Sequence, residues 1–419
     1  MSSLPPPPIS SSPPYGSSCL PLFLLSPGYL NLNHGSFGTV GRKVLERQRE
    51  YTDEQEGRPD VWFRDTYLKL LSSTLTNLSQ YLSLPSPTNL VLLENASSGV
   101  NSVLRSLPLL KGDVILYLST AYSMVKNTAA FLANERGVTL LEVKVSIPVA
   151  SEEDFLKPLS SAIKGMGSGE RLKLAIFSHV SSTPSFIEPI VALSSVVKSL
   201  SPKCKVLVDG AHVLGQLPLN LNSLGEHVDY YVSNCHKWMY APKGSAFLWC
   251  KDTSGVQPTV ISSRNKVDPP GSGVGEVPDF GSRYAYTGTK DFTAYLAVSD
   301  AIAFRSELEG SRGMSVIEYN TGLGRWAGDY LVGLWGTRRL CPREMEAFMI
   351  NVELPTNAIE EAERMRVKML EEEGVYMLVL RDEGSGIVYT RLSMQVYLER
   401  EDFVRVGELV LKYLRHNEV

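Results

Sequence analysis

The sequence predicts an α/β fold in which a mostly parallel β-sheet carries helices on both faces. Between residues 89 and 250, short apolar segments alternate with segments of helical pattern. The apolar segments are rich in β-branched residues and bounded by turn-forming residues, which is typical of buried strands. Helical segments of about 10–15 residues between them indicate βαβ crossovers, and therefore parallel pairing. In such a sheet, ligands bind beyond the carboxyl ends of the strands.

The strand and helix boundaries follow from these patterns. We predict strands at residues 89–93, 113–118, 172–177, 205–208, 230–232 and 245–249. The segment 100–107 is predicted to be a helix, with Asn95, Ser97 and Ser98 as its cap residues. These elements together form the core of the predicted sheet.

The character of the chain changes on either side of this region. Residues 253–290 are rich in Gly, Pro and Ser, which indicates a long functional loop. Beyond it we expect helices at 294–308 and 357–372 and strands at 375–380 and 386–392. The predicted organisation is a large domain over residues 29–300 and a smaller C-terminal α+β domain over 301–419, to which the N-terminal segment also contributes.

The N-terminal 28 residues are predicted to be a disordered tail. Ser and Pro dominate the first 18 residues, and prolines lack the backbone donor that regular structure needs. A transit peptide is the alternative, because no Asp or Glu occurs before residue 42. The absence of Arg from the same stretch and its Pro-rich composition favour the tail.

Composition excludes several classes of protein. The 419 residues are 43% apolar and 21% charged, enough for two or three domains and a large core. With 41 Lys and Arg against 45 Asp and Glu, there is no basic surface for nucleic acid. Five cysteines form no disulfide framework, and no apolar run reaches about 18 residues. We expect a cytoplasmic protein that binds neither nucleic acid nor membrane.

Chemistry-bearing residues gather at three predicted strand ends. Asp209 ends a buried strand and is followed by Gly210, Ala211 and His212. Such a residue is often only a helix cap. Lys237 lies in the segment 233–238, and an isolated lysine usually belongs to a solvated face. The third feature, residues 94–99, is a strand-to-helix turn of small residues that could hold a phosphate at a helix N-terminus.

Taken together, the three features predict a pyridoxal phosphate site. A helix N-terminus would hold the phosphate, a lysine would form the Schiff base, and a carboxylate would keep the pyridine nitrogen protonated. Asp209 and Lys237 are separated by room for one helix and one returning strand. A metal site made of Cys235, His212 and His236 is the weaker reading, because adjacent side chains rarely converge on one ion. We therefore expect no metal.

These motifs resemble the class V aminotransferase family of fold-type I pyridoxal phosphate enzymes. Within it, residues 32–38 (LNHGSFG), 95–99 (NASSG) and 286–291 (YTGTKD) are similar to the branch of isopenicillin N epimerase, cysteine desulfhydrases and hercynylcysteine sulfoxide lyases. The resemblance covers roughly residues 30–410. It implies a large domain with a mostly parallel, seven-stranded sheet and a smaller α+β domain.

The resemblance also implies roles for individual residues. Lys237 and Asp209 would be the Schiff-base lysine and the partner of the pyridine nitrogen, and Tyr122 would stack on the ring. Other implied cofactor contacts come from Ser97, Ser98, His212, His236 and Thr289. The implied substrate-binding residues are Arg391, which would take the α-carboxylate, together with Asn33 and His34. Thr289 matches a threonine that, in the family, reaches the phosphate bound by the neighbouring subunit. The resemblance therefore implies a homodimer.

The function expected from the resemblance is C–S lyase chemistry on cysteine or a cysteine S-conjugate or sulfoxide. Lys237 would remove the Cα proton, and loss of sulfur from Cβ would give pyruvate and ammonia. A persulfide route is disfavoured because Cys204, Cys235 and Cys341 do not lie on Gly/Ser-rich loops. Two alternatives remain open at this point: an isopenicillin N epimerase-like amino-acid epimerase, and a non-catalytic pyridoxal phosphate-binding protein.

Overall fold

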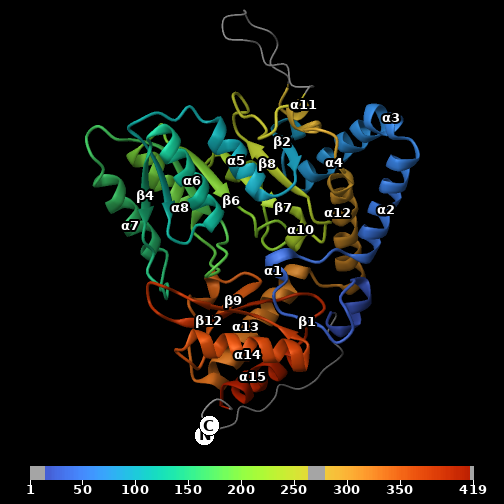
Figure 1. Ribbon diagram of the computed structural model, residues 1–419, viewed down its shortest axis with the longest axis vertical. Helices are drawn as coiled ribbons and strands as arrows, with labels where there is room; N and C mark the ends of the chain where they lie inside the picture. The colour runs from blue at the N-terminus through green and yellow to red at the C-terminus, as the bar shows by residue number, and fades with distance from the viewer. Residues whose placement is uncertain (1–14, 263–278, 416–419) are drawn as a thin grey trace, which may run out of the picture.

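A twisted, seven-stranded sheet forms the centre of the larger domain. The computed structural model describes residues 15–262 and 279–415. The strand order is β2-β8-β7-β6-β5-β3-β4, in which β8 runs antiparallel to both of its neighbours and the other pairs are parallel (Figure 1). The bounds are β2 Leu90–Leu93, β3 Asp113–Leu118, β4 Thr139–Val143, β5 Arg171–Ser178, β6 Lys205–Asp209, β7 Tyr230–Asn234 and β8 Ala246–Cys250. The mostly parallel, seven-stranded α/β fold is therefore confirmed.

Helices cover both faces of this sheet because alternate residues of its strands enter two separate cores. In β3, Val114 and Leu116 pack in one core, whereas Ile115 and Tyr117 pack in the other. This alternation is the period-2 geometry of a strand buried on both faces. The covering helices are α5 (Ala96–Ser106) and α6 (Ser123–Arg136) on one face and α7 (Glu153–Lys164) and α8 (Ile190–Leu200) on the other.

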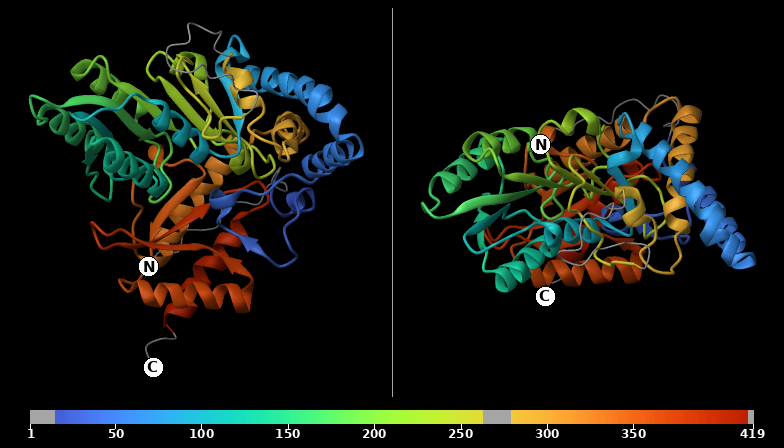
Figure 2. Two further views of the ribbon diagram at one scale, coloured as in Figure 1. Left: turned by 45° about the horizontal axis from the view of Figure 1, so that its top comes forward. Right: turned by 90° about the horizontal axis from the view of Figure 1, so that it is seen from above.

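A smaller α+β unit packs below the large sheet in Figure 1 and appears in orange to red in both views of Figure 2. Its three-stranded antiparallel sheet has the order β11-β12-β9. The bounds are β9 Met349–Glu353, β11 Leu378–Arg381 and β12 Val388–Ser393, with helices α13 Val316–Trp335, α14 Ile359–Glu373 and α15 Arg400–Arg415. The N-terminal strand β1 (Leu30–Asn31) pairs with β10 (Val375–Tyr376), so the start of the chain joins this unit.

The remaining elements connect and brace the two units. Helix α12 (Thr293–Arg312) crosses the predicted domain boundary at residue 300, and α2 (Arg42–Gly57) and α4 (Tyr67–Tyr81) pack against it. The shorter elements are η1 Ser17–Leu22, α1 His34–Phe37, α3 Pro59–Val61, η2 Trp62–Thr66, η3 Pro87–Asn89, α9 Leu221–Leu224, α10 Cys235–Trp238, α11 Phe280–Ala285 and η4 Arg343–Met345. None of the helices among the described residues is both long and apolar enough to cross a membrane.

Two sequence-based expectations need correction. The predicted disordered tail is wrong for residues 15–28, because Tyr15, Cys19 and Phe23 are buried in the core; residues 1–14 lie outside the described residues. Strand β4 was not predicted. Its first four residues are exposed or half-buried at the edge of the sheet, so they lack the fully apolar run that marks the other strands. The predicted loop 253–290 contains α11, and its residues 263–278 lie outside the described residues.

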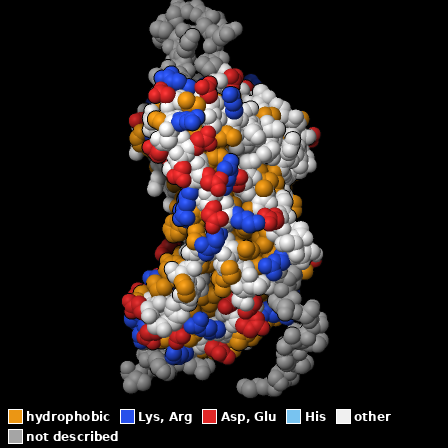
Figure 3. All heavy atoms as spheres, turned by 90° about the vertical axis from the view of Figure 1, so that its right-hand side faces the viewer, with side chains coloured by type: hydrophobic (Ala, Val, Ile, Leu, Met, Phe, Trp, Pro, Cys, Tyr) orange, Lys and Arg blue, Asp and Glu red, His pale blue; other side chains and the backbone are white. Residues whose placement is uncertain are grey.

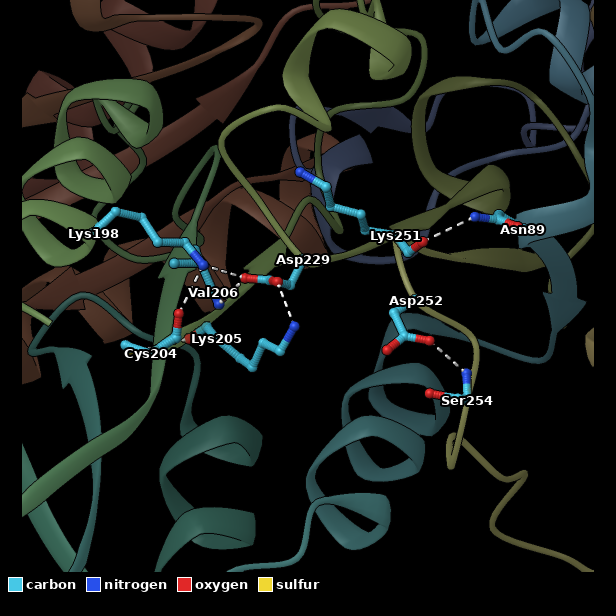
Figure 4. A network of polar contacts seen from close by, with 9 residues as sticks. All are labelled: Asn89, Lys198, Cys204, Lys205, Val206, Asp229, Lys251, Asp252 and Ser254. Carbon is cyan, nitrogen blue, oxygen red and sulfur yellow. Dashed lines mark hydrogen bonds and ion pairs between the residues drawn. The ribbon is translucent and has the colours of Figure 1, made fainter. Parts of the chain in front are cut away.

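An ion network lies at the amino ends of β6 and β7, opposite the carboxyl ends where the cavity opens (Figure 4). Asp229 binds the Nζ atoms of Lys198 at 2.7 Å and Lys205 at 3.0 Å and accepts a hydrogen bond from the Val206 N–H at 2.9 Å. Burial alone would raise the pKa of Asp229, but these hydrogen bonds outweigh it and hold the pKa below its usual value. The network joins β6 to β7 far from the ends where ligands bind.

The surface that contains α2 has no single sign of charge. Figure 3 shows Lys and Arg side chains intermixed with Asp and Glu along this face. Arg47, for example, pairs with Glu50 one turn away, and Lys43 pairs with Glu307 of α12. Exposed pairs of this kind contribute little to stability, so we attribute to this face no more than solvation and helix bracing.

Candidate active site

A cavity of about 360 Å³ opens at the carboxyl ends of β5, β6 and β7 and is closed on one side by the small unit. Ser178 and Asp209, the last residues of β5 and β6, lie on its large-domain wall. Leu378 and Arg391 contribute from the small unit. Among the predicted site residues, those that line it are Ser97, Tyr122, Asp209, His212, His236, Lys237 and Arg391. The fold thus gathers side chains that are widely separated in sequence.

Lys237 lies on the short helix α10, directly after β7. Its Nζ is 3.0 Å from His212 Nε2, and its backbone carbonyl accepts a 2.6 Å hydrogen bond from His34 Nε2. Burial lowers the pKa of Lys237 from 10.5 to about 7, although the charge of Asp209 acts in the opposite direction. The amine is therefore partly neutral at physiological pH, which is the state that a nucleophile or a base requires.

Asp209 places a carboxylate at the base of the cavity. Its Oδ1 accepts a hydrogen bond from the Ala211 N–H at 3.0 Å, and no hydrogen bond from a described residue reaches Oδ2. Burial raises the pKa of Asp209, while that hydrogen bond and the charge of Lys237 lower it. An unpaired carboxylate oxygen at this depth calls for a cationic or N–H partner from a ligand.

Two histidines flank Lys237, and burial lowers the pKa of each. The pKa of His236 falls to about 4 and that of His212 falls well below its usual value. His236 Nδ1 donates to the Ser245 carbonyl at 2.8 Å, which leaves Nε2 on the other side of the ring. His212 Nδ1 is buried without a hydrogen-bond partner among the described residues. Both rings are neutral, so each has one donor and one acceptor; in His236 the donor is used by Ser245, which leaves Nε2 as an acceptor.

The N-terminus of α5 leaves one backbone donor free at the cavity. The N–H of Ala96 donates to Asn234 Oδ1 at 2.8 Å, and the N–H of Ser98 donates to Asn95 Oδ1 at 2.9 Å. The Gly99 N–H reaches the Asn95 carbonyl at 3.3 Å. The N–H of Ser97 has no acceptor among the described residues, and Ser97 itself lines the cavity. This free donor and the helix dipole favour an anion such as a phosphate.

Arg391, in the middle of β12, is 1% exposed and forms no ion pair with a described residue. Its Nη1 donates to Ser182, at 2.9 Å to the carbonyl and 3.2 Å to Oγ. Its Nη2 donates to Asn33 Oδ1 at 2.8 Å and to Ser36 Oγ at 2.9 Å. Burial lowers the pKa of Arg391 to about 10, so the guanidinium stays charged at neutral pH. A buried cation without a counter-ion calls for an anionic ligand.

Two aromatic side chains border the cavity. Tyr122, which precedes α6, is 48% exposed, and Phe37 at the end of α1 is 72% exposed. Large aromatic side chains with this much free surface, next to a polar cavity, offer faces on which a planar ligand can stack. The predicted stacking position of Tyr122 is compatible with this placement.

Four predicted residues lie elsewhere. Asn33 and His34 are not among the residues that line the cavity: Asn33 accepts a hydrogen bond from Arg391, and His34 contacts the Lys237 carbonyl and the Trp238 ring. Both residues contact residues that line the cavity, and their direct contact with substrate stays a prediction. The N–H and the hydroxyl of Ser98 donate to Asn95 Oδ1 at the helix cap, and Ser98 lines a smaller neighbouring cavity. Thr289 is exposed and hydrogen-bonded to Tyr286 on the same chain.

Sequence reasoning missed a buried acid behind the site. Glu188 is 1% exposed and accepts hydrogen bonds from Thr120 Oγ1 at 2.6 Å and from the Ser178 N–H at 3.2 Å. Burial, together with the nearby charge of Asp209, raises the pKa of Glu188 to about 8. Glu188 is thus mostly neutral at pH 7. No local motif distinguishes Glu188 in the sequence, because its burial depends on distant strands.

Comparison with known proteins supports the same chemistry. Residues 41–406 match the family model described as aminotransferase class-V. The chain belongs to the class-V aminotransferase family. Pyridoxal 5′-phosphate is the cofactor of this class-V enzyme, and the residues described above fit it: a poised lysine, a carboxylate with a free oxygen, and a helix N-terminus with a free donor.

Individual relatives match two thirds or more of this class-V chain at low identity. It is 27% identical over 420 residues to an L-cysteine desulfhydrase of Arabidopsis thaliana, covering 93% of this chain and 88% of that one. It is 27% identical over 406 residues to hercynylcysteine sulfoxide lyase of Schizosaccharomyces pombe, covering 94% and 97%. With isopenicillin N epimerase of Streptomyces clavuligerus, 30% identity extends over 68% of this chain and 71% of that one.

Solved structures share the class-V fold. The cysteine desulfurase CsdA of Escherichia coli superposes with a TM-score of 0.75 at 15% identity, covering 97% of this chain and 100% of that one. The cystine C–S lyase C-DES superposes with a TM-score of 0.70 at 19% identity, covering 91% and 97%. At these identities the likeness establishes the fold alone. Within the described ranges, no three His, Cys, Asp or Glu side chains are arranged to hold a metal ion.

Proposed function

We propose that this protein is a pyridoxal phosphate-dependent C–S lyase that acts on L-cysteine or on a cysteine S-conjugate or sulfoxide. The observation that carries the proposal is the pairing of Lys237, whose burial lowers its pKa to about 7, with Arg391, a buried guanidinium without a counter-ion, in one cavity. An α-amino acid has the carboxylate that Arg391 needs and the acidic Cα proton that a neutral amine can remove.

Each residue of the site has a distinct task in this proposal. Arg391 attracts the α-carboxylate of the substrate through its positive charge, and Asn33 and Ser182 fix the orientation of the guanidinium. Lys237 in its neutral form accepts the Cα proton. Bound pyridoxal phosphate supplies the sink for the electron pair that this proton leaves behind. Asp209 holds a proton on the pyridine nitrogen through its free oxygen, and Ser97 binds the phosphate.

The products follow from the leaving group on Cβ. When the Cα–H bond breaks and its electrons displace the sulfur, the leaving group takes up a proton. It departs as hydrogen sulfide from cysteine, as a thiol from a thioether and as a sulfenic acid from a sulfoxide. Hydrolysis of the remaining three-carbon unit gives pyruvate and ammonia. Without a leaving group on Cβ, return of a proton to Cα from the opposite side would give epimerisation instead, which is the alternative function.

The cysteines of the chain favour a lyase over a sulfur-transfer enzyme. All five are buried with free thiols, and none lines the cavity. Burial raises the pKa of Cys204 to about 12 and also raises those of Cys235 and Cys341. A persulfide carrier requires an accessible thiolate. In this proposal the sulfur of the substrate therefore leaves with its own substituent and is not transferred to a cysteine of the chain.

Pyruvate release tests the proposal. We expect the purified holoenzyme to release pyruvate from L-cysteine or from S-substituted cysteines. Replacing Lys237 with Ala should lower the rate on the order of a thousandfold and abolish the visible absorbance of the bound cofactor. Lys251→Ala is the matched control, because Lys251 is exposed at the opposite end of the sheet, as Figure 4 shows. The Lys251→Ala variant should leave the rate and the visible absorbance unchanged.

Two outcomes would overturn the C–S lyase. Exchange of the Cα proton with solvent without pyruvate release from any sulfur amino acid would favour the epimerase. A visible cofactor band with neither exchange nor pyruvate would indicate a non-catalytic pyridoxal phosphate-binding protein.

A further inference from the structure

A second cavity, of about 690 Å³, lies beside the active site in the cleft between the two units. Its large-domain wall contains Ser119 and Thr120, which follow β3, and Glu142, in β4. Its small-unit wall is the turn between β11 and β12, residues 381–385. The function proposed above needs only the first cavity, so the second has no assigned use.

Three features place the second cavity next to the active site. Thr183 lines both cavities. Strand β11 also borders both, with Leu378 at the active site and Arg381 at the second cavity. The segment after β3 does the same, with Thr120 in the second cavity and Tyr122 in the first. Thr183 is therefore the point that a substrate bound at Arg391 would have to pass in order to reach the second cavity.

The large-domain wall is internally paired. Glu142 binds Lys126 Nζ at 2.9 Å through Oε1 and Lys144 Nζ at 2.7 Å through Oε2. Lys126 Nζ also donates to the Ser119 carbonyl at 2.8 Å. Hydrogen bonds from Lys144 and Lys126 hold the pKa of Glu142 below its usual value. This wall is therefore a fixed polar surface, with both carboxylate oxygens already in use.

The opposite wall presents one cation and one anion without partners. Arg381 and Glu383 are exposed, and neither side chain forms a hydrogen bond or ion pair with another described residue. The residue between them, Asp382, is already occupied, because it accepts hydrogen bonds from Ser385 N–H at 2.7 Å and Ser385 Oγ at 2.8 Å. A guanidinium and a carboxylate side by side on one turn match a ligand that carries both charges.

We propose that the second cavity binds the distal end of a cysteine thioether whose sulfur substituent ends in a zwitterionic amino-acid head group. Arg381 takes the distal carboxylate and Glu383 takes the distal ammonium. The inference rests on the proposed C–S lyase function, since it specifies the substrate class of the same site. It makes the long S-conjugate, and not free cysteine, the preferred substrate.

Matched thioethers test this specificity. L-cystathionine ends in an amino-acid head group, S-butyl-L-cysteine has a similar length without charge, and S-(2-aminoethyl)- and S-(2-carboxyethyl)-L-cysteine carry one charge each. We expect kcat/KM to be highest for L-cystathionine. In Arg381→Gln and in Glu383→Gln, the ratio of kcat/KM for L-cystathionine to that for S-butyl-L-cysteine should fall about fivefold, the size expected for one exposed charge pair.

Two control variants and a binding measurement separate the possible failures. Arg64→Gln and Glu360→Gln, exposed residues outside both cavities, should leave the ratio unchanged. Equal kcat/KM for all four thioethers would refute the zwitterion site. So would an unchanged ratio of kcat/KM for L-cystathionine to that for S-butyl-L-cysteine in both cavity variants. In either case, release of pyruvate would still support the lyase. If no thioether yields pyruvate but the dissociation constant for L-cystathionine, measured by tryptophan fluorescence, still rises in the cavity variants, the lyase fails and the binding site stands.

Discussion

Lys237 and Arg391 are two basic side chains that the fold places in one cavity without giving either one an ion pair among the described residues. Burial lowers both pKa values, but the consequences differ. At about 10, the pKa of Arg391 leaves the guanidinium charged and able to bind a carboxylate. At about 7, the pKa of Lys237 leaves much of the amine neutral and reactive. One physical effect thus produces an anion-binding group and a base in the same cavity.

The low pKa of Lys237 predicts how capture of the cofactor depends on pH. Because only the neutral amine is nucleophilic, the rate at which apoprotein takes up pyridoxal phosphate should rise as pH rises through about 7 and level off above 8. At pH 6 it should be about tenfold below the plateau. Stopped-flow absorbance measures this rate. A rate that kept rising to pH 10 would show that Lys237 has the pKa of an exposed lysine.

The hydrogen bond between Asn33 and Arg391 provides a second prediction at the scale of residues. Asn33→Ala removes one of the two acceptors that hold Arg391 Nη2. We expect KM to rise about tenfold while kcat changes less than twofold, because the guanidinium keeps its charge but loses its fixed orientation. Asn89→Ala, which changes a half-buried residue just before the edge strand β2 (Figure 4), is the control. A fall in kcat as large as the rise in KM would contradict a positioning role.

At the scale of elements, the N-terminal segment shows why composition misleads. Tyr15 donates to the Met314 carbonyl at 2.6 Å, and the Gly16 N–H donates to the Val396 carbonyl at 2.8 Å. The ring of Phe23 packs against the rings of Tyr240 and Tyr397, with centroids 5.4 Å and 5.2 Å apart. Although this segment has no core of its own, it completes the core of the rest of the chain.

The packing of Phe23 predicts a measurable loss of stability. Phe23 is 1% exposed, so Phe23→Ala should lower the free energy of unfolding by about 3 kcal/mol through lost burial and a residual cavity. Leu110→Ala, at a residue that is 65% exposed, should change it by less than about 0.5 kcal/mol. Urea denaturation of the apoprotein measures both. Equal midpoints for the two variants would show that residues 15–28 detach from the core.

Edge and interior strands differ in how well the sequence predicts them. Strands such as β3 and β6 are buried on both faces and appear as continuous apolar runs. Strand β4 lies at the edge of the sheet, and only Val143 at its end is buried. Its residues need not be apolar, so the local pattern carries no signal, and pairing with β3 defines it.

At the scale of the whole molecule, we propose that two chains form a homodimer in which Thr289 of one chain contacts the phosphate at its partner's site. On a single chain, Thr289 is exposed and does not line the cavity. The residues before it, 263–278, lie outside the described part of the chain. The family resemblance and the exposed position of Thr289 support the proposal.

Subunit mixing tests the dimer. Lys237→Ala and Thr289→Ala chains should each be inactive or strongly impaired. In a heterodimer of the two, one site keeps its own Lys237 and receives Thr289 from the Lys237→Ala chain. Denaturing and refolding an equal mixture should therefore restore about a quarter of the wild-type activity, since half of the dimers carry one complete site out of two. No recovery, with a dimer seen by light scattering, would show that Thr289 serves its own chain.

The sequence by itself determined the α/β class, most interior strands, the cofactor and the motif residues Lys237 and Asp209, because each depends on a local pattern of burial or on residues close together in the chain. Tertiary structure decided what depends on distant contacts. Asn33 and His34 lie behind Arg391 and Lys237, and Glu188 becomes a neutral acid only because strands enclose it. Burial sets these pKa values and positions, and burial is a property of the packed chain.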